Sequence, residues 1–362
     1  MKAFLIGITA WCWLTACSEP APRSSVFSQP AASASVGAQV VPERPVVWPQ
    51  DHASHPAFAL EWWYLTFVLS DEQQRQYGLQ FTLFRFTTNP PYDSHWTNGQ
   101  QWMGHASLHT PTAHFYEERL AGGGVGNAGV SAAPFMLAID NWQWVSANTD
   151  LFPSVLQFSI QNDVSVELAL TTSGPLIAHG QGGYSEKSAS GKYRSYYYSQ
   201  PFIQASGQLA IGPKQGSAAT AVKVKGQGWF DHEWSSQLAN NDALGWDWFS
   251  VHLQDGAKLM VFTMHVKGEA PYTTGTFITA HGESTTLAGD ALSITASGYE
   301  AINGQQVPVE WQIDLAEPAM HLTIKPFKPG QWNPGRVAYY EGRIQVSGSH
   351  QGTGFMELTG YQ

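Results

Sequence analysis

Apolar and polar residues alternate along most of the chain from residue 46 onward. In residues 163–171, single polar or small residues separate Val164, Val166, Leu168 and Leu170. Successive side chains of a β-strand point to opposite faces, so this pattern predicts a strand with one buried face. The same alternation recurs in residues 77–83, 259–263, 311–315, 320–324 and 344–346. No amphipathic helical period follows residue 17, and we therefore predict an all-β protein.

Two parts of the chain repeat each other in degenerate form. Residues 61–69, an aromatic stretch before a polar turn, resemble residues 246–253, which precede the hairpin dipeptide Asp255-Gly256. Residues 197–207 and the glycine-rich segment 226–234 are likewise echoed by residues 339–348 and 352–360. The repeat predicts two tandem antiparallel β-barrels, the first spanning residues 46–236 and the second residues 237–362.

The first 45 residues have a different composition. Residues 1–16 contain Lys2, an apolar run and small residues, which is the plan of a signal peptide. The ending Leu-Thr-Ala-Cys predicts lipidation of Cys17; the alternative is a simple cleaved signal with an incidental cysteine. Residues 17–45 are rich in Pro, Ala and Ser and are predicted to form a flexible tether. We expect an exported protein that is lipid-anchored in a bacterial cell envelope, at the outer membrane if the cell has two.

Charge and composition exclude some partners. The chain has a formal net charge of −10, and removing the signal with Lys2 leaves 17 basic against 28 acidic residues, or −11. Nucleic acids and anionic bilayer surfaces need cationic patches, so neither is an expected partner, apart from contact with a membrane through the N-terminal lipid. Aromatic residues make up 13% of the chain, enough for a large aromatic core.

Residues 226–249 combine four tryptophans with Asp231, His232, Glu233 and Asp247. Acids and histidine are costly to bury unless they are paired or used, so this mixture marks a candidate site. In a strand, Trp229, Asp231 and Glu233 would share one face, and Phe230, His232 and Trp234 the other. The alternative is a structural network at the end of a barrel strand, since such networks also gather ionisable groups.

Five motifs together resemble those of the lipocalin-like AttH family. They are EWWY at 61–64, YYS at 197–199, GQGWFDHEW at 226–234, GWDWF at 245–249 and GTGFMELTGY at 352–361. The family is similar to carotenoid 1,2-hydratase, to exported proteins called predicted secreted hydrolases, and to fungal hydratases and cyclases. The resemblance covers about residues 49–362 and implies two lipocalin-like barrels packed side by side.

The resemblance also implies residue roles. The hydratase members protonate a C=C bond, and the histidine and tryptophan that act there match His232 and Trp234 here. Asp247 is the nearest match to their aspartate, and Glu61 is a second candidate acid. Protonation needs an acid in a dry site, and aromatic faces to stabilise the cation. The expected ligand-binding residues, which would line a chamber shared by His232 and Asp247, are Trp62, Trp63, Tyr64, His105, Tyr197, Trp229, Trp234 and Trp246.

Two function classes follow from these observations. The first is a hydro-lyase of the hydratase type that hydrates or isomerises a C=C bond in a hydrophobic molecule. The second is a non-catalytic carrier of a lipid or apolar metabolite beside an ABC-type export system. No Gly-x-Ser-x-Gly elbow, P-loop or nucleotide fingerprint is present, so a hydrolase has no visible nucleophile. No cofactor is expected, and no metal, because the histidines of residues 104–114 lack zinc-site spacing.

Overall fold

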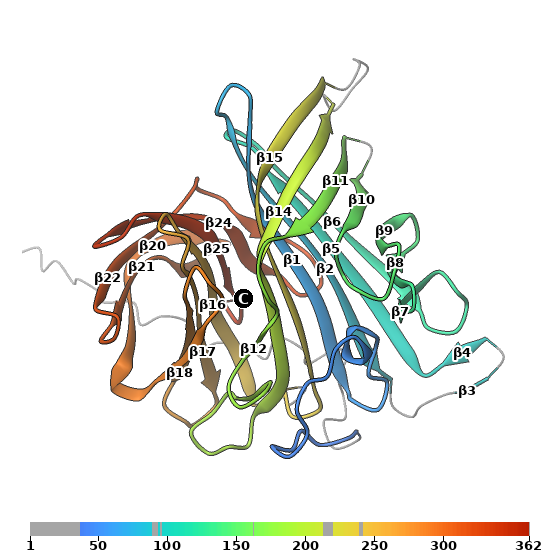
Figure 1. The fold of residues 1–362 in the computed structure, drawn as a ribbon, viewed down its shortest axis with the longest axis horizontal. Helices are drawn as coiled ribbons and strands as arrows, with labels where there is room; N and C mark the ends of the chain where they lie inside the picture. Colours follow the sequence, from blue (N-terminus) through green and yellow to red (C-terminus); the bar gives the residue numbers. More distant parts are fainter. Residues whose placement is uncertain are drawn as a thin grey trace, which may run out of the picture.

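The computed structural model describes residues 37–88, 93–94, 96–161, 163–212, 220–238 and 242–361. These residues form two large antiparallel sheets that lie side by side, with the first sheet on the right of Figure 1 and the second on the left. The predicted signal peptide, Cys17 and the first part of the predicted tether lie outside the described residues. None of the helices in the described segments has the length and apolar character needed to span a bilayer.

The first sheet curls into a nearly closed barrel. Its strand order is β6-β5-β2-β1-β15-β14-β11-β10-β9-β8-β7, with β12 and β13 paired to β14. Near the gap in the barrel wall, the N–H of Gln161 donates to Glu117 on edge strand β6. The strands are β1 (Leu60–Asp71), β2 (Gln76–Thr87), β5 (Gln100–His109), β6 (His114–Gly122), β7 (Ala128–Ala132), β8 (Phe135–Ile139), β9 (Trp142–Ser146), β10 (Ser154–Ile160), β11 (Val164–Thr172), β12 (Ile177–Ala178), β13 (Tyr184–Glu186), β14 (Arg194–Ile211) and β15 (Thr220–Ser235).

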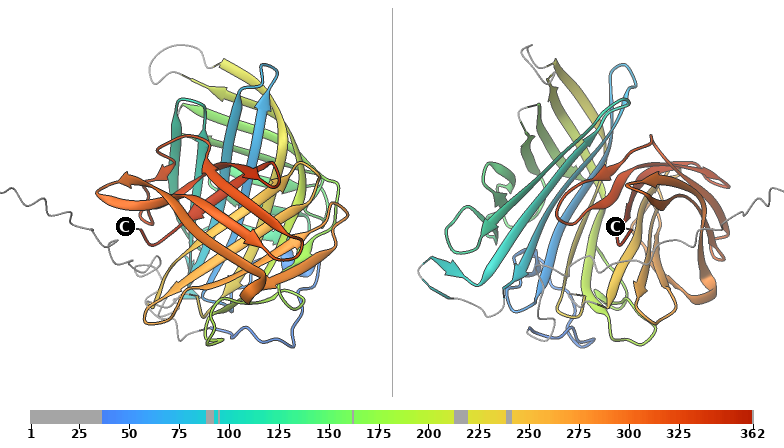
Figure 2. Two further views of the ribbon diagram at one scale, coloured as in Figure 1. Left: turned by 90° about the vertical axis from the view of Figure 1, so that its left-hand side faces the viewer. Right: turned by 180° about the vertical axis from the view of Figure 1, so that it is seen from behind.

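The second sheet is a half-barrel whose curvature is plain in Figure 2. Its strand order is β19-β18-β17-β16-β25-β24-β22-β21-β20, with β23 paired to β24. The strands are β16 (Ala243–Leu253), β17 (Lys258–Val266), β18 (Tyr272–Ile278), β19 (Ser284–Ala288), β20 (Leu292–Ile302), β21 (Gln305–Leu315), β22 (Met320–Pro326), β23 (Trp332–Asn333), β24 (Tyr339–Gly348) and β25 (Gly352–Leu358). A separate hairpin pairs β3 (Asp93–Ser94) with β4 (Thr97–Asn98), and the 3-10 turns are η1 (Gln50–His52) and η2 (Gly289–Ala291).

Strand order confirms both the all-β prediction and the internal repeat. The central run β5-β2-β1-β15-β14-β11 of the first sheet has the same connectivity as β18-β17-β16-β25-β24-β22 of the second. Register corrects the sequence alignment of the repeat, because Tyr64 lies opposite Asp231 and Trp248 lies opposite Glu357. Tyr64 is therefore equivalent to Trp248, and Asp247 is equivalent to Trp63 rather than to an acid of β1.

The alternation of side chains on the central strands divides the buried apolar residues of the described segments among three hydrophobic cores. Trp63 and Phe230 belong to the core inside the first barrel, whereas Tyr64 and Trp229, their chain neighbours, belong to a core between the two sheets. Phe249 lies in the third core, inside the half-barrel. Strands β1 and β15 thus have no solvent face along much of their length, and they divide the barrel interior from the junction.

The packed body begins before residue 46, which corrects the expected end of the tether. Val40 is fully buried in the core of the first barrel. The N–H of Val41 donates to the hydroxyl of Tyr196, and Ala38 donates to the carbonyl of Ala57. Residues 37–58 therefore pack against the barrel and carry Asp51, His52 and His55 to its interior.

Close approach of strands β16 and β25 requires a glycine at position 354. A Cβ added to Gly354 would lie 1.8 Å from the carbonyl oxygen of Ser250, which is backbone and has little freedom to shift. We predict that Gly354→Ala lowers the free energy of unfolding by at least about 2 kcal/mol, measured by urea denaturation. Gly129→Ala in strand β7, where a Cβ meets nothing within 4 Å, is the matched control. Equal stability of the two variants would contradict this register.

Candidate functional site

Strand β15 carries the candidate chemistry on two opposite faces, as its sequence predicts. Phe230 and Trp234 point into the core of the first barrel, and His232 lies with them, stacked on Trp63 with a centroid separation of 4.5 Å. Asp231 and Glu233 instead line a cavity at the junction of the sheets. The short stretch Asp231-His232-Glu233 therefore supplies two separate sites.

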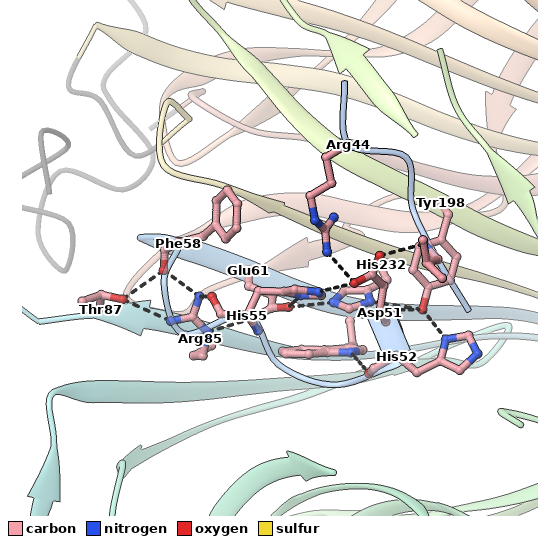
Figure 3. A network of polar contacts seen from close by, with 12 residues as sticks. Arg44, Asp51, His52, His55, Phe58, Glu61, Arg85, Thr87, Tyr198 and His232 are labelled. Atoms are coloured by element: carbon pink, nitrogen blue, oxygen red, sulfur yellow. Dashed lines mark hydrogen bonds and ion pairs between the residues drawn. The ribbon is translucent and has the colours of Figure 1, made fainter. Parts of the chain in front are cut away.

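The barrel face holds an imidazole–carboxylate cluster, made of His55, Glu61, His232, Asp51 and Arg85 (Figure 3). Glu61 Oε1 lies 2.6 Å from His55 Nδ1 and 2.9 Å from His232 Nε2. Arg85 Nε donates to the other oxygen of Glu61 over 2.8 Å. The far nitrogen of His55 contacts Asp51 at 3.0 Å.

Charge and burial act in opposite directions in this cluster. Burial opposes ionisation of Glu61, but the charge of His55 and the hydrogen bonds from His232 and His55 hold the pKa of Glu61 well below its usual range. Burial also disfavours the cation of His55, yet Glu61 and Asp51 raise the pKa of His55 above its ordinary value. His232 is fully buried, which lowers its pKa to about 4 despite Glu61. The cluster is thus an ion pair of Glu61 and His55 beside a neutral His232.

Among the described residues, this cluster also brings together a set of ligand atoms that could hold a metal ion. One ligand atom each from His55, Glu61 and His232 lies within 4.8 Å of the others. Glu61 Oε1 already accepts from both imidazoles, and Arg85 occupies its second oxygen. Protons and a guanidinium therefore satisfy this carboxylate, and the arrangement fits a hydrogen-bond network better than a divalent cation.

The junction face forms a cavity of about 30 Å³ between the two sheets. Trp62 and Trp246 lie at one side with their rings parallel, at 9° and a centroid separation of 6.0 Å. Tyr64 and Trp248 meet edge to face at 5.2 Å. Trp62 and Trp246 occupy equivalent positions in the two halves of the repeat, as do Tyr64 and Trp248. Each sheet therefore contributes one half of the aromatic wall. The lining residues are Trp62, Tyr64, Asp231, Glu233, Leu238, Trp246, Trp248, Phe262 and Glu357.

Asp231 is a buried carboxyl group with an unusual affinity for its proton. The side chains of Trp229 and Tyr197 donate to it over 2.6 and 2.9 Å, and Ser199 Oγ contacts it as well. Burial raises the pKa of Asp231 to about 7, and the neighbouring charge of Glu233 acts in the same direction, against the hydrogen bonds. At neutral pH this group can therefore act either as an acid or as a base.

Glu357 is the equivalent of Asp231 in the second half of the repeat, and it behaves in the same way. The indole of Trp246 donates to it over 2.5 Å. Burial raises the pKa of Glu357 to about 7. It pairs with Glu341, whose pKa burial and the charge of Glu357 raise well above the usual range. Glu233, which also lines the cavity, forms a buried ion pair with Lys187 at 3.0 Å.

The structure contradicts the expectation that His232 and Asp247 share one chamber. Asp247 is buried between His265 Nε2, at 2.7 Å, and the hydroxyl of Tyr361, at 2.9 Å. Neither His232 nor Asp247 lines the junction cavity. The reason is the register of β16, which turns Trp246 and Trp248 to the junction and Asp247 away from it. A catalytic role for His232, Glu61 or Asp247 stays a prediction.

The other residues expected from the sequence divide between the two faces. Trp62, Tyr64 and Trp246 line the junction cavity, and Tyr197 and Trp229 hold Asp231. Trp63 and Trp234 belong to the barrel core instead. His105 is buried between the hydroxyl of Tyr339, at 3.0 Å, and Glu118, at 3.2 Å, outside the cavity.

Sequence reasoning missed four functional candidates: His55, Arg85, Glu341 and Glu357. The segment Asp-His-Ala-Ser-His at 51–55 gathers three ionisable residues, but it lies in a loop with no strand pattern to orient it. Glu357 had a usable signal, because the repeat aligns Gly-Gln-Gly-Trp-Phe-Asp with Gly-Thr-Gly-Phe-Met-Glu. That alignment pairs Glu357 with Asp231.

Comparison with known proteins identifies relatives of the whole body. The family model described as AttH-like matches residues 39–361. The solved structure of a putative AttH protein from Nitrosomonas europaea has 30% sequence identity and a TM-score of 0.78, covering 90% of this chain and 99% of that one. Kievitone hydratase from Nectria haematococca has 17% identity and a TM-score of 0.63, covering 94% and 98%.

A further structure, CghA with Sch210972, has 13% identity and a TM-score of 0.59, with 94% of this chain and 98% of that one covered. At such identities the likeness to CghA and to kievitone hydratase shows the fold alone. No curated protein matches the sequence significantly.

The ion pair of Glu61 predicts a pH-dependent contribution to stability. Removing one partner of a buried pair leaves the other charge uncompensated, so Glu61→Gln should lower the free energy of unfolding by roughly 3–5 kcal/mol near pH 6. Because the folded state lowers the pKa of Glu61 from 4.5, its contribution is present above that pH and is lost on further acidification. The free energy of unfolding, measured by urea denaturation, should therefore fall more steeply for the wild type than for the variant as the pH is lowered from about 6 to about 3.

The control is Asp314→Asn, which removes an exposed pair with His321 and should cost less than about 1 kcal/mol. A Glu61→Gln protein as stable as the wild type, with the same pH dependence, would show that the cluster does not hold the fold.

Proposed function

The chain belongs to the AttH-like family, and from that premise we propose that it is a hydratase-type enzyme acting on a C=C bond of a hydrophobic small molecule. The name of one structural relative, kievitone hydratase, supports this reaction class. The observation that carries the proposal is the pair Asp231 and Glu357, a buried and a half-buried carboxyl group with pKa values of about 7 that line one aromatic cavity.

The two carboxyl groups suit the two proton transfers of hydration. In its protonated form Asp231 donates a proton to one alkene carbon, and a carbocation develops on the other. Water then attacks that carbon while Glu357, as a carboxylate, accepts the proton that the water releases. The sum is addition of one water, and exchange with water removes the proton gained by Glu357 and restores the proton lost by Asp231. The roles can also be exchanged between them.

The aromatic wall stabilises the cation and keeps other water out. Indole and phenol faces attract positive charge, most strongly where bulk water is excluded. Trp248 and Tyr64 are nearly fully buried and fixed by contact with each other, so their faces do not reorganise during the reaction. The same side chains would stabilise the cation formed during isomerisation of a C=C bond, a reaction in which water is not a reactant.

The volume of the junction cavity indicates how a substrate would reach Asp231 and Glu357. A cavity of about 30 Å³ holds about one water molecule, which is the second reactant. The hydrophobic substrate therefore enters by displacing part of the wall. Trp62 is the half-buried member of its parallel pair with Trp246, and it is the residue we expect to move.

A carrier is the second candidate function, and a different space favours it. A groove of about 390 Å³ lies between the β12–β13 region of the first sheet and strands β17, β18 and β19 of the second. Tyr184, Met260 and Tyr272 give it apolar surface, and its volume lies within the range of small-molecule sites. As a carrier, the protein would be exported and anchored through lipidated Cys17. It would hold a lipid or apolar metabolite beside an ABC-type export system.

Native mass spectrometry of the purified protein separates the two functions. A co-purifying molecule that is released unchanged supports the carrier. Conversion of that molecule to a product heavier by one water, with heavy oxygen incorporated from labelled water, supports the hydratase.

The acid pair predicts the effect of two substitutions on turnover of such a molecule. Asp231→Asn and Glu357→Gln each remove one proton-transferring group and should lower kcat roughly 10²–10⁴-fold. The wild-type rate should be bell-shaped in pH with its maximum near 7, since one group must be protonated and the other ionised.

Asp247→Asn, assayed beside them, tests the assignment made from the sequence. Its side chain faces His265 and Tyr361 rather than the cavity, so we expect its kcat to stay within about threefold of the wild type. Loss of activity in Asp247→Asn together with full activity in Asp231→Asn would show that Asp247, the acid inferred from the sequence, takes part in the reaction and that Asp231 does not.

A further inference from the structure

A polar groove of about 430 Å³ lies between the two sheets at the hairpin of β1 and β2, and neither proposed function uses it. Gln76 and Gln227 contribute from the first sheet, and His252, Arg343 and Gln345 from the second. We call it the Arg343 groove.

Arg343 is a buried cation without a counter-ion. Only 7% of its surface is exposed, and Nη1 donates to the backbone carbonyls of Leu69 and Tyr77, each over 3.1 Å. Its Nε has no hydrogen-bond partner, and no carboxylate in the described part of the chain lies within ion-pair distance of it. Burial lowers its pKa only to about 10, so it stays charged at neutral pH. A buried charge without a counter-ion is unfavourable, and here, among the described residues, only the two carbonyls and the ring of Phe327, 5.2 Å from the guanidinium carbon, offset that cost.

Two other buried polar atoms without partners belong to residues of the same groove. They are Oε1 of Gln227 and Nδ1 of His252. His252 is neutral at physiological pH because burial lowers its pKa to about 3, so Nδ1 can carry a proton and donate it. Oε1 of Gln227 can only accept. A ligand that satisfies all three atoms must accept from Arg343 and donate to Gln227, and it meets Nδ1 of His252 as donor or acceptor according to which ring nitrogen carries the proton.

The charge of the groove contrasts with that of the chain. No aspartate or glutamate occurs among its described lining residues, although the chain carries a net charge of −10. Lys325 adds a second, half-exposed cation, whose only described partner is Glu310 at 3.1 Å. Water could satisfy Gln227 and His252, but it would not neutralise the guanidinium. The groove is therefore built for an anion.

We propose that the Arg343 groove binds a small oxyanion that also carries hydroxyl groups, of the hydroxy-carboxylate or sugar-phosphate type. The oxyanion faces Arg343 and Lys325, and a ligand hydroxyl donates to Gln227. This site lies apart from the junction cavity, shares no lining residue with it, and does not depend on hydration chemistry.

Calorimetric titration of the full chain tests the site. The probes are inorganic phosphate, gluconate and glucose 6-phosphate, each against sodium chloride of equal ionic strength. Binding of gluconate but not phosphate identifies the carboxylate source, and binding of both phosphates but not gluconate identifies the phosphate source. Either result supports the site if the substitutions below weaken it.

Two substitutions supply the decisive comparison without removing Arg343, whose loss could disturb folding. Gln227→Glu places a competing carboxylate in the groove, and Lys325→Gln removes the half-exposed cation. Each should weaken binding at least about tenfold, the value of one charged hydrogen bond. Gln208→Glu makes the same charge change in a different groove, on strand β14, and should leave binding unchanged.

Gln227→Glu should also raise the melting temperature of the free protein, because it compensates Arg343, whereas Gln208→Glu should not. The proposal is overturned if no probe binds above the chloride reference, or if Gln227→Glu and Gln208→Glu bind the probes equally well.

Discussion

The strict alternation of side chains along strands β1 and β15 is the constraint on which the rest of the molecule depends. Both strands are covered on each face, by the interior of the first barrel on one side and by the second sheet on the other. A shift of one residue in their register would exchange the two sets of side chains. His232 would then face the junction, and Asp231 would lie against the aromatic core. Packing of large residues on both faces prevents such a shift.

Because of the internal repeat, the same alternation in both sheets places equivalent side chains around one cavity. Equivalent strands of the two sheets meet at the junction, so Asp231 faces the same cavity as Glu357, and Trp62 stacks on Trp246. The sheet opposite to each carboxyl group buries Asp231 and leaves Glu357 half-buried. Raised pKa values follow from that burial, and they reduce folding stability above the ordinary pKa range of the acids. The aromatic packing of the junction offsets this cost.

Sequence reasoning predicted the architecture better than the site, and the reason is physical. Period-two alternation and the aromatic repeat depend on local geometry, so the strands and their faces could be inferred. The alternation of residues 229–234 between the two faces of strand β15 is one example. Whether Asp247 joins His232 depends on the register between distant strands, which the spacing of residues does not encode. His55 enters from a loop, and its position is set only when residues 37–58 pack on the barrel.

The most direct test of the central claim is an infrared difference titration of the junction carboxyl groups Asp231 and Glu357. We predict that the wild type shows protonated carboxyl bands that disappear as pH rises through about 7, and that Asp231→Asn and Glu357→Gln each remove one of them. Carboxyl groups that are fully ionised by about pH 5, or bands that persist unchanged in both variants, would contradict the account.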